Sequence, residues 1–131
     1  MSAVIKELTK SEEQMMDIFW SSEKALTSVD IVNMKIRDTW VNGLVHNIIR
    51  SLIRKGLLIE CGAERYSTQY ARRLSPKITR EEYAAKLLVS KFQEKTSVAE
   101  VIAALVKERR EEENLIEKLE EIIQRLRKED E

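Results

Sequence analysis

The order of the hydrophobic patterns in the first half of the chain constrains the fold most. Apolar residues recur at helical spacing in three successive segments, which lie at 8–21, from Thr27 onward and at about 41–55. Two short segments typical of β-strands follow, Leu57–Cys61 and Tyr66–Ala71, with Gly62–Arg65 predicted as the turn between them. Only three glycines and one proline interrupt the chain, so long helices are permitted. The chain is therefore expected to be mostly α with a small β-hairpin.

Capping residues mark where these helices begin and end. Thr9 and Glu12 have the spacing of a capping box, and a second box is expected to begin at Thr79. Thr27 is predicted to start the second helix, because its hydroxyl can accept from a free amide of the first turn. Gly56 follows two basic residues and is predicted to end the third helix.

Residues 79–131 carry a second set of helical stripes, after a linker at 72–78. The apolar residues expected to bring two copies of the chain together are Leu87, Leu88, Phe92, Val98, Val101, Ile102, Leu105, Leu115, Leu119, Ile122 and Leu126. A helical tail cannot bury all of these against itself, so residues 79–131 are predicted to form a helical dimerisation region beside a domain at 1–78. A monomer whose tail folds back on the first domain is the alternative. The charged stretch 107–113 leaves open whether the helix breaks there.

The net charge of the chain is zero, but its two parts differ. Residues 1–80 hold 13 basic and 9 acidic residues, whereas residues 81–131 hold 10 and 14. The excess of +4 in the first part suits an anionic partner such as DNA, although a charge of this size is also ordinary for a domain.

A single cysteine, Cys61, excludes an internal disulfide framework and a cysteine-rich zinc site. No helix N-terminus lies in its local sequence, so a buried or half-buried structural thiol is favoured over a redox sensor. No apolar run approaches the roughly 20 residues that span a bilayer, and no signal pattern opens the chain. The protein is expected in the cytoplasm, without membrane insertion.

The third predicted helix has two unlike faces. One face is apolar and is expected to start at Val41. The apolar face of the second predicted helix is expected to include Ile36. The other face of the third helix carries hydrogen-bonding side chains and no carboxylate, namely Asn42, His46, Asn47, Arg50 and Arg54. Asparagine can pair with two atoms of adenine and arginine with two of guanine, whereas a solvated helix face favours Glu and Lys. Three helices and a hairpin are the plan of a winged helix-turn-helix, whose third helix enters a major groove, so DNA reading is favoured over a solvated face.

Basic residues also lie in the predicted hairpin. Arg65 falls at the expected turn, and Arg72 and Arg73 follow the second expected strand. These side chains suit a phosphate backbone or a minor groove, but exposed charges beside Glu60 and Glu64 are an equally good interpretation.

Over nearly its whole length the chain resembles the penicillinase repressor family of bacterial winged-helix regulators (BlaI/MecI/CopY type). The matching segments are LTKSEEQMMDIFW at 8–20, SVDIV at 28–32, TWVNGLVHNIIRSLIRKGLL at 39–58, Tyr66–Tyr70, and KTSVAEVIAAL at 95–105. The residues in register within the first 60 are Glu12, Trp20, Trp40, Leu52 and Lys55–Gly56. The resemblance implies a homodimer that binds a palindromic operator through a recognition helix at about 41–55 and blocks transcription.

The family also implies release by a membrane sensor-protease or, in one branch, by copper. The copper branch carries a cysteine cluster near its C-terminus, and this chain has Cys61 alone, so copper release is not expected. The beta-lactam branch is cut at an Asn-Phe bond, where this chain has about Lys86-Leu87, so release through cleavage by a sensor-protease partner is not expected.

The recognition helix departs from the family in its first turns. Where the family tends to carry Pro, Lys, Thr and Arg, this chain has Asn42, Gly43, Leu44 and His46, so a different operator is expected. Gly43 weakens the helix by about 1 kcal/mol relative to alanine, or else it permits close approach of a phosphate.

The predicted DNA-contacting residues are Ser28, Asn42, Gly43, His46, Asn47, Arg50, Arg54 and Arg65. An enzyme is not expected, because His46 is the only histidine and no phosphate loop or catalytic arrangement is present. No metal site or cofactor is expected either, and His46 is taken as a DNA contact or a neutral exposed side chain. A winged-helix protein–protein interaction module with a coiled-coil-like scaffold tail is the alternative function.

Overall fold

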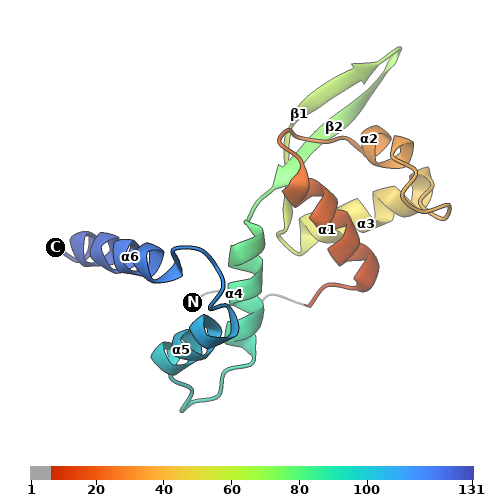
Figure 1. Cartoon of the computed structure of the whole chain (residues 1–131). Helices are drawn as coiled ribbons and strands as arrows, with labels where there is room; N and C mark the ends of the chain where they lie inside the picture. Colours follow the sequence, from red (N-terminus) through yellow and green to blue (C-terminus); the bar gives the residue numbers. More distant parts are fainter. Residues whose placement is uncertain (1–6) are drawn as a thin grey trace. The chain divides into compact units, whose positions relative to one another are not determined.

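The computed structural model describes residues 7–131, which form helices and one antiparallel hairpin (Figure 1). The elements are α1 (Lys10–Ser21), α2 (Ser28–Asn33), α3 (Asn42–Arg54), β1 (Leu58–Tyr66), β2 (Gln69–Pro76), α4 (Arg80–Ser90), α5 (Val98–Glu108) and α6 (Leu115–Glu129). The predicted fold class, a winged helix followed by a helical region, is confirmed. The chain divides into two compact units, one ending at Lys91 and one from Phe92 to Glu131. The functional division expected after residue 78 stays a prediction.

The expected capping boxes are confirmed, and a third is present. The Thr9 hydroxyl accepts from the Glu12 amide at 3.2 Å, and the Glu12 carboxylate accepts from the Thr9 amide at 2.9 Å. The same reciprocal pair forms at the start of α4, from Thr79, and at the start of α2, from Thr27. Each box satisfies two amides that would otherwise lack a partner in the first turn. By contrast, Val41 gives α3 no side-chain cap.

The core of the first unit lies where α1, α2 and α3 meet the base of the hairpin (Figure 1). Its fully buried residues include Met15, Met16, Phe19, Ile31, Val45, Leu52, Leu57 and Leu58. Tyr83 of α4 also belongs to this core, at 6% exposure, and its hydroxyl accepts a hydrogen bond from the Leu8 amide at 3.3 Å. The start of α4 is therefore part of the winged-helix unit.

Two residues expected on buried helix faces are exposed. The second helix ends at Asn33, so Ile36 lies beyond it and is 40% exposed. Val41 is the N-cap of α3 and is 59% exposed. The apolar pattern continues beyond Asn33 without a glycine or proline, so the predicted second helix ran past its true end to Ile36. The third helix was instead predicted to begin one residue too early, at Val41.

The predicted turn of the hairpin is wrong. The strands run on to Tyr66 and Gln69, so the turn lies at Ser67–Thr68, where Ser67 adopts a left-handed φ of 56°. Gly62, at φ 149°, instead follows a register shift between Glu60 and Gly62, which is a β-bulge. The apparent turn signal at Gly62 is thus a strand irregularity, and the true turn contains no glycine.

Four residues of the hairpin are placed differently from their prediction. Arg65 is not at the turn but in β1, paired with Tyr70 of β2. Arg72 and Arg73 lie within β2 rather than in a linker. Cys61, expected to be buried or half-buried, is exposed in β1, because both strands extend beyond the core there.

The second unit contains two helices separated by a break. Helix α5 ends at Glu108 and α6 begins at Leu115, after Asn114 in a left-handed conformation at φ 58°. The charged stretch 107–113 therefore does interrupt the helix. Between Phe92 and Glu131, all of which the structure describes, no residue is buried. Among the described helices, none combines the length and apolar character needed to cross a membrane.

Candidate nucleic-acid interface

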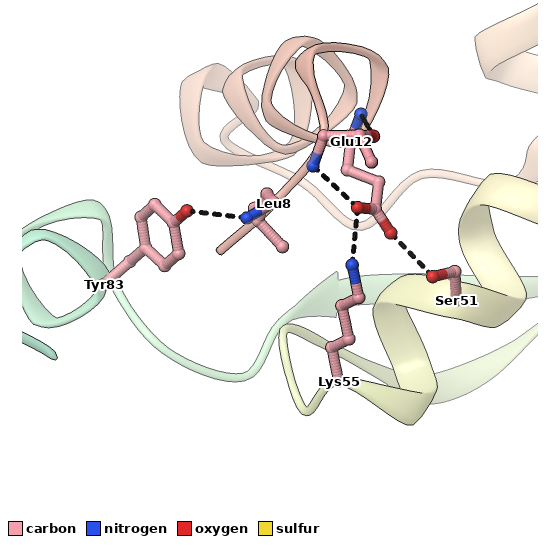
Figure 2. A network of polar contacts seen from close by, with 6 residues as sticks. Leu8, Glu12, Ser51, Lys55 and Tyr83 are labelled. Atoms are coloured by element: carbon pink, nitrogen blue, oxygen red, sulfur yellow. Dashed lines mark hydrogen bonds and ion pairs between the residues drawn. The ribbon is translucent and has the colours of Figure 1, made fainter. Parts of the chain in front are cut away.

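A buried carboxylate holds α3 against α1 (Figure 2). The Ser51 hydroxyl donates to Glu12 Oε2 at 2.6 Å, and the Lys55 ammonium donates to Glu12 Oε1 at 2.7 Å. Burial alone would raise the pKa of Glu12, but the hydrogen bonds from Lys55, Ser51 and the Thr9 amide outweigh it and lower the pKa to about 2. One side chain thus caps α1 and fixes the position of α3.

The Glu12→Gln variant is expected to lower the free energy of unfolding near neutral pH by roughly 2–3 kcal/mol, because Lys55 loses its charged partner. The folded-state pKa lies below the ordinary 4.5, so this stabilisation is complete above about pH 4.5 and is lost as the pH falls towards about 2. Urea unfolding across that pH window should show that the free energy of unfolding falls less in the Glu12→Gln variant than in wild type as the pH is lowered. The exposed neighbour Glu13 supplies the control, Glu13→Gln. Equal pH dependence in wild type and Glu12→Gln would contradict this role.

The hairpin is fixed to the helices by two sets of contacts. Leu26 and Leu74 exchange backbone hydrogen bonds of 3.0 and 2.8 Å, which adds a bridge to β2 just before α2. Farther along, the hydroxyls of Thr27 and Tyr66 lie 2.8 Å apart. The Thr27 bond lowers the pKa of Tyr66, but burial and the carboxylates of Asp30 and Glu64 raise it more, so this phenol stays protonated at neutral pH. The hairpin, which is the wing of the winged helix, therefore has a defined position beside the start of α2.

An open groove of about 430 Å³ lies between α3, the start of α2 and β2. Its polar and basic lining comes from Ser28, Asn42, His46, Arg50, Gln69, Tyr70 and Arg72, and its apolar part from Val29, Ile49, Ile53, Ala71 and Leu74. No carboxylate of the described part of the chain lines it, although Arg72 forms an ion pair with Glu60 at 2.7 Å. The groove can accept an anionic, hydrogen-bonding surface between a helix and a strand.

The structure brings together four of the predicted DNA-contacting residues in this groove, namely Ser28, Asn42, His46 and Arg50. Ser28 contributes little surface, at 8% exposure. Three others, Gly43, Asn47 and Arg54, are exposed on α3 outside the groove. Their spacing of four and seven residues places them on one stripe, which also includes Arg50.

The eighth predicted residue, Arg65, lies on the hairpin. Its guanidinium carbon is 6.0 Å from the centre of the Tyr70 ring, a cation–π arrangement across the strand pair. Because side chains alternate along a strand, Tyr70, Arg72 and Leu74 share one face of β2, with Arg65 opposite Tyr70. We call Arg65, Tyr70 and Arg72 the wing row.

Sequence reasoning missed Gln69 and Tyr70 as groove residues. The signal for Tyr70 was the alternation of Tyr70, Arg72 and Leu74, which is visible only once the second strand is extended past Ala71. The predicted end of that strand at Ala71 hid it. No such pattern marked Gln69.

Comparison with protein families gives one match. The family model described as penicillinase repressor matches residues 8–125, which include α1 to α5 and most of α6. A search of the curated proteins finds no match for the chain.

Proposed function

The chain belongs to the penicillinase repressor family, whose members are DNA-binding transcriptional repressors, and from this premise we propose that it binds a palindromic operator as a homodimer with α3 in the major groove. The observation that carries the proposal is the groove between α3 and β2. Asn42, His46 and Arg50 present donors and acceptors there, beside Arg72 and without a lining carboxylate. These are the side-chain types that hydrogen-bond to base edges and phosphates.

The wing row supplies the contacts to the DNA backbone in this proposal. Tyr70 is 70% exposed, and the Arg72 side chain is 72% exposed although it is paired with Glu60, so both are accessible to a phosphate chain that leaves the major groove. Contacts of this kind set the register of a protein on the duplex without reading sequence. Sequence reading is assigned to α3.

The Glu60→Gln variant is expected to bind all DNA more tightly, by roughly three- to tenfold, because it frees Arg72 to neutralise a phosphate. The ion pair between Arg72 and Glu60 is exposed, so its loss should leave stability almost unchanged. Binding isotherms over a series of salt concentrations should show a salt slope that steepens by about one phosphate contact. Glu23→Gln, an exposed carboxylate away from the wing, controls for net charge. An unchanged affinity and slope would remove Arg72 from the interface.

Dimerisation is assigned to the second unit. The unit from Phe92 to Glu131 has no buried residue, while Val98, Ile102 and Leu105 on α5 are 57, 44 and 50% exposed. On α6, Ile116, Ile122, Ile123 and Leu126 are 39 to 53% exposed. Apolar surface of this extent favours a partner surface, and a second copy would place two α3 helices on the two halves of a palindrome.

Selection of bound fragments from random and genomic DNA tests the function directly. We expect enrichment of a palindrome whose half-sites are separated by about one helical turn or a multiple of it. Footprinting of the enriched site should then protect major-groove positions in both halves. Recovery of fragments with no shared sequence at physiological salt would contradict an operator-specific repressor.

A further inference from the structure

The first turn of α3 exposes an apolar surface that the groove does not explain. Val41 is 59% exposed and Leu44 40%, and Gly43 lies exposed between them. No charged side chain occurs from Val41 to Val45. We propose that this turn reads thymine methyl groups in the operator, and that Gly43 lets the edges of the bases approach the helix backbone. This inference rests on the proposed function and names the bases that the recognition helix selects.

Nothing among residues 7–131 requires glycine at position 43. Its backbone does not adopt a positive φ, unlike that of Gly56 and Gly62. A Cβ atom built on Gly43 would meet no atom within 4 Å. Glycine weakens a helix relative to alanine, so alanine would be the better residue here for the isolated protein. The missing side chain therefore leaves open space at the helix surface, where another molecule can approach the backbone.

The chemistry of the exposed turn selects one kind of base pair. Thymine projects a methyl group into the major groove, and apolar side chains contact it there. Asn42, between Val41 and Gly43, has the amide that pairs with N6 and N7 of adenine. The N-terminal residues of a recognition helix are those that meet base edges. A phosphate would accept from the uncapped amides of this turn, but it would leave the exposed apolar side chains of Val41 and Leu44 without a partner. The turn therefore fits A·T pairs.

The test uses the full-length protein and the operator obtained by selection, with each thymine replaced in turn by deoxyuridine, which lacks only the methyl group. We expect wild type to lose affinity by roughly fourfold for each methyl that meets Val41 or Leu44, at one or two positions in each half-site. The same replacement should cost the Val41→Ala, Leu44→Ala double variant little or nothing. If replacing every thymine with deoxyuridine leaves the operator affinity of the wild-type protein unchanged, the thymine assignment is wrong.

Gly43→Ala tests the close approach, and stability and binding should change in opposite directions. The variant should unfold at a slightly higher temperature and bind the operator at least roughly tenfold more weakly, because its methyl group separates the packed surfaces. Its affinity for unrelated DNA should match wild type. Gln14→Ala, a neutral change on α1 outside the groove, is the control. If Gly43→Ala leaves operator affinity unchanged, or lowers the affinity for unrelated DNA equally, the proposed role of Gly43 is wrong. If the wild-type protein itself prefers no DNA sequence, the proposed function is wrong.

Discussion

Replacing Arg50 with alanine should weaken binding to the selected operator by roughly 10- to 100-fold, the range expected for one bidentate base contact. Arg50 is the one basic residue that lies both in the groove and on the exposed stripe of α3. Its side chain makes no ion pair among the described residues, so its removal should leave the folded protein intact. Fluorescence anisotropy with labelled operator and with unrelated DNA measures the two affinities.

The comparison between the two DNAs decides what Arg50 does. A base contact should reduce the ratio of operator affinity to unrelated-DNA affinity, whereas a phosphate contact should reduce both affinities equally. Arg110→Ala, an exposed arginine between α5 and α6 that makes no ion pair among the described residues, controls for the loss of one positive charge. Asn47→Ala, on the same stripe, should also lose specificity. Wild-type affinity in both the Arg50 and Asn47 variants would exclude this face of α3 as the reader.

The helical part of the fold could be predicted because its signals are local. Thr9 and Glu12 are three residues apart, and a capping box needs only that spacing and the right side chains. The second role of Glu12, which is to hold α3 against α1, could not be predicted from such local spacing. Its contacts with Ser51 and Lys55 span about 40 residues and depend on the packing of α1 against α3.

The wing was predicted less well because its strands are largely exposed. Strand periodicity is informative when one face is buried, but from Ile59 to Arg65 every residue of β1 is exposed. Gly62 therefore looked like a turn although it marks a bulge, and Ser67 supplied the left-handed residue that glycine usually provides. The groove residues Gln69 and Tyr70 were missed for this reason, while those on α3 were found.

Cutting the chain after Lys91 should convert a dimer into a folded monomer and weaken operator binding by roughly 100- to 10,000-fold, because the second half-site would no longer be bound intramolecularly. The position of the cut follows from the core. Tyr83 of α4 is buried and contacts Leu8, so a cut before α4 would damage the winged-helix unit itself. A cut at the boundary between the two units keeps that contact. Sedimentation at micromolar concentration measures the mass, and thermal unfolding checks that the fragment is folded.

A point substitution in the full-length chain separates loss of the dimer from loss of forty residues. Val98, Ile102 and Leu105 recur at intervals of four and three, so they form one exposed stripe of α5. Leu105→Glu places a charge in the proposed interface, where burial without a partner is costly, and should shift the protein towards monomer. Ala103→Glu adds the same charge to an exposed position off that stripe and should leave the dimer intact. A monomeric wild type, or a fragment ending at Lys91 that still dimerises, would contradict the assignment, because in either case the apolar faces of α5 and α6 would not be what joins two copies.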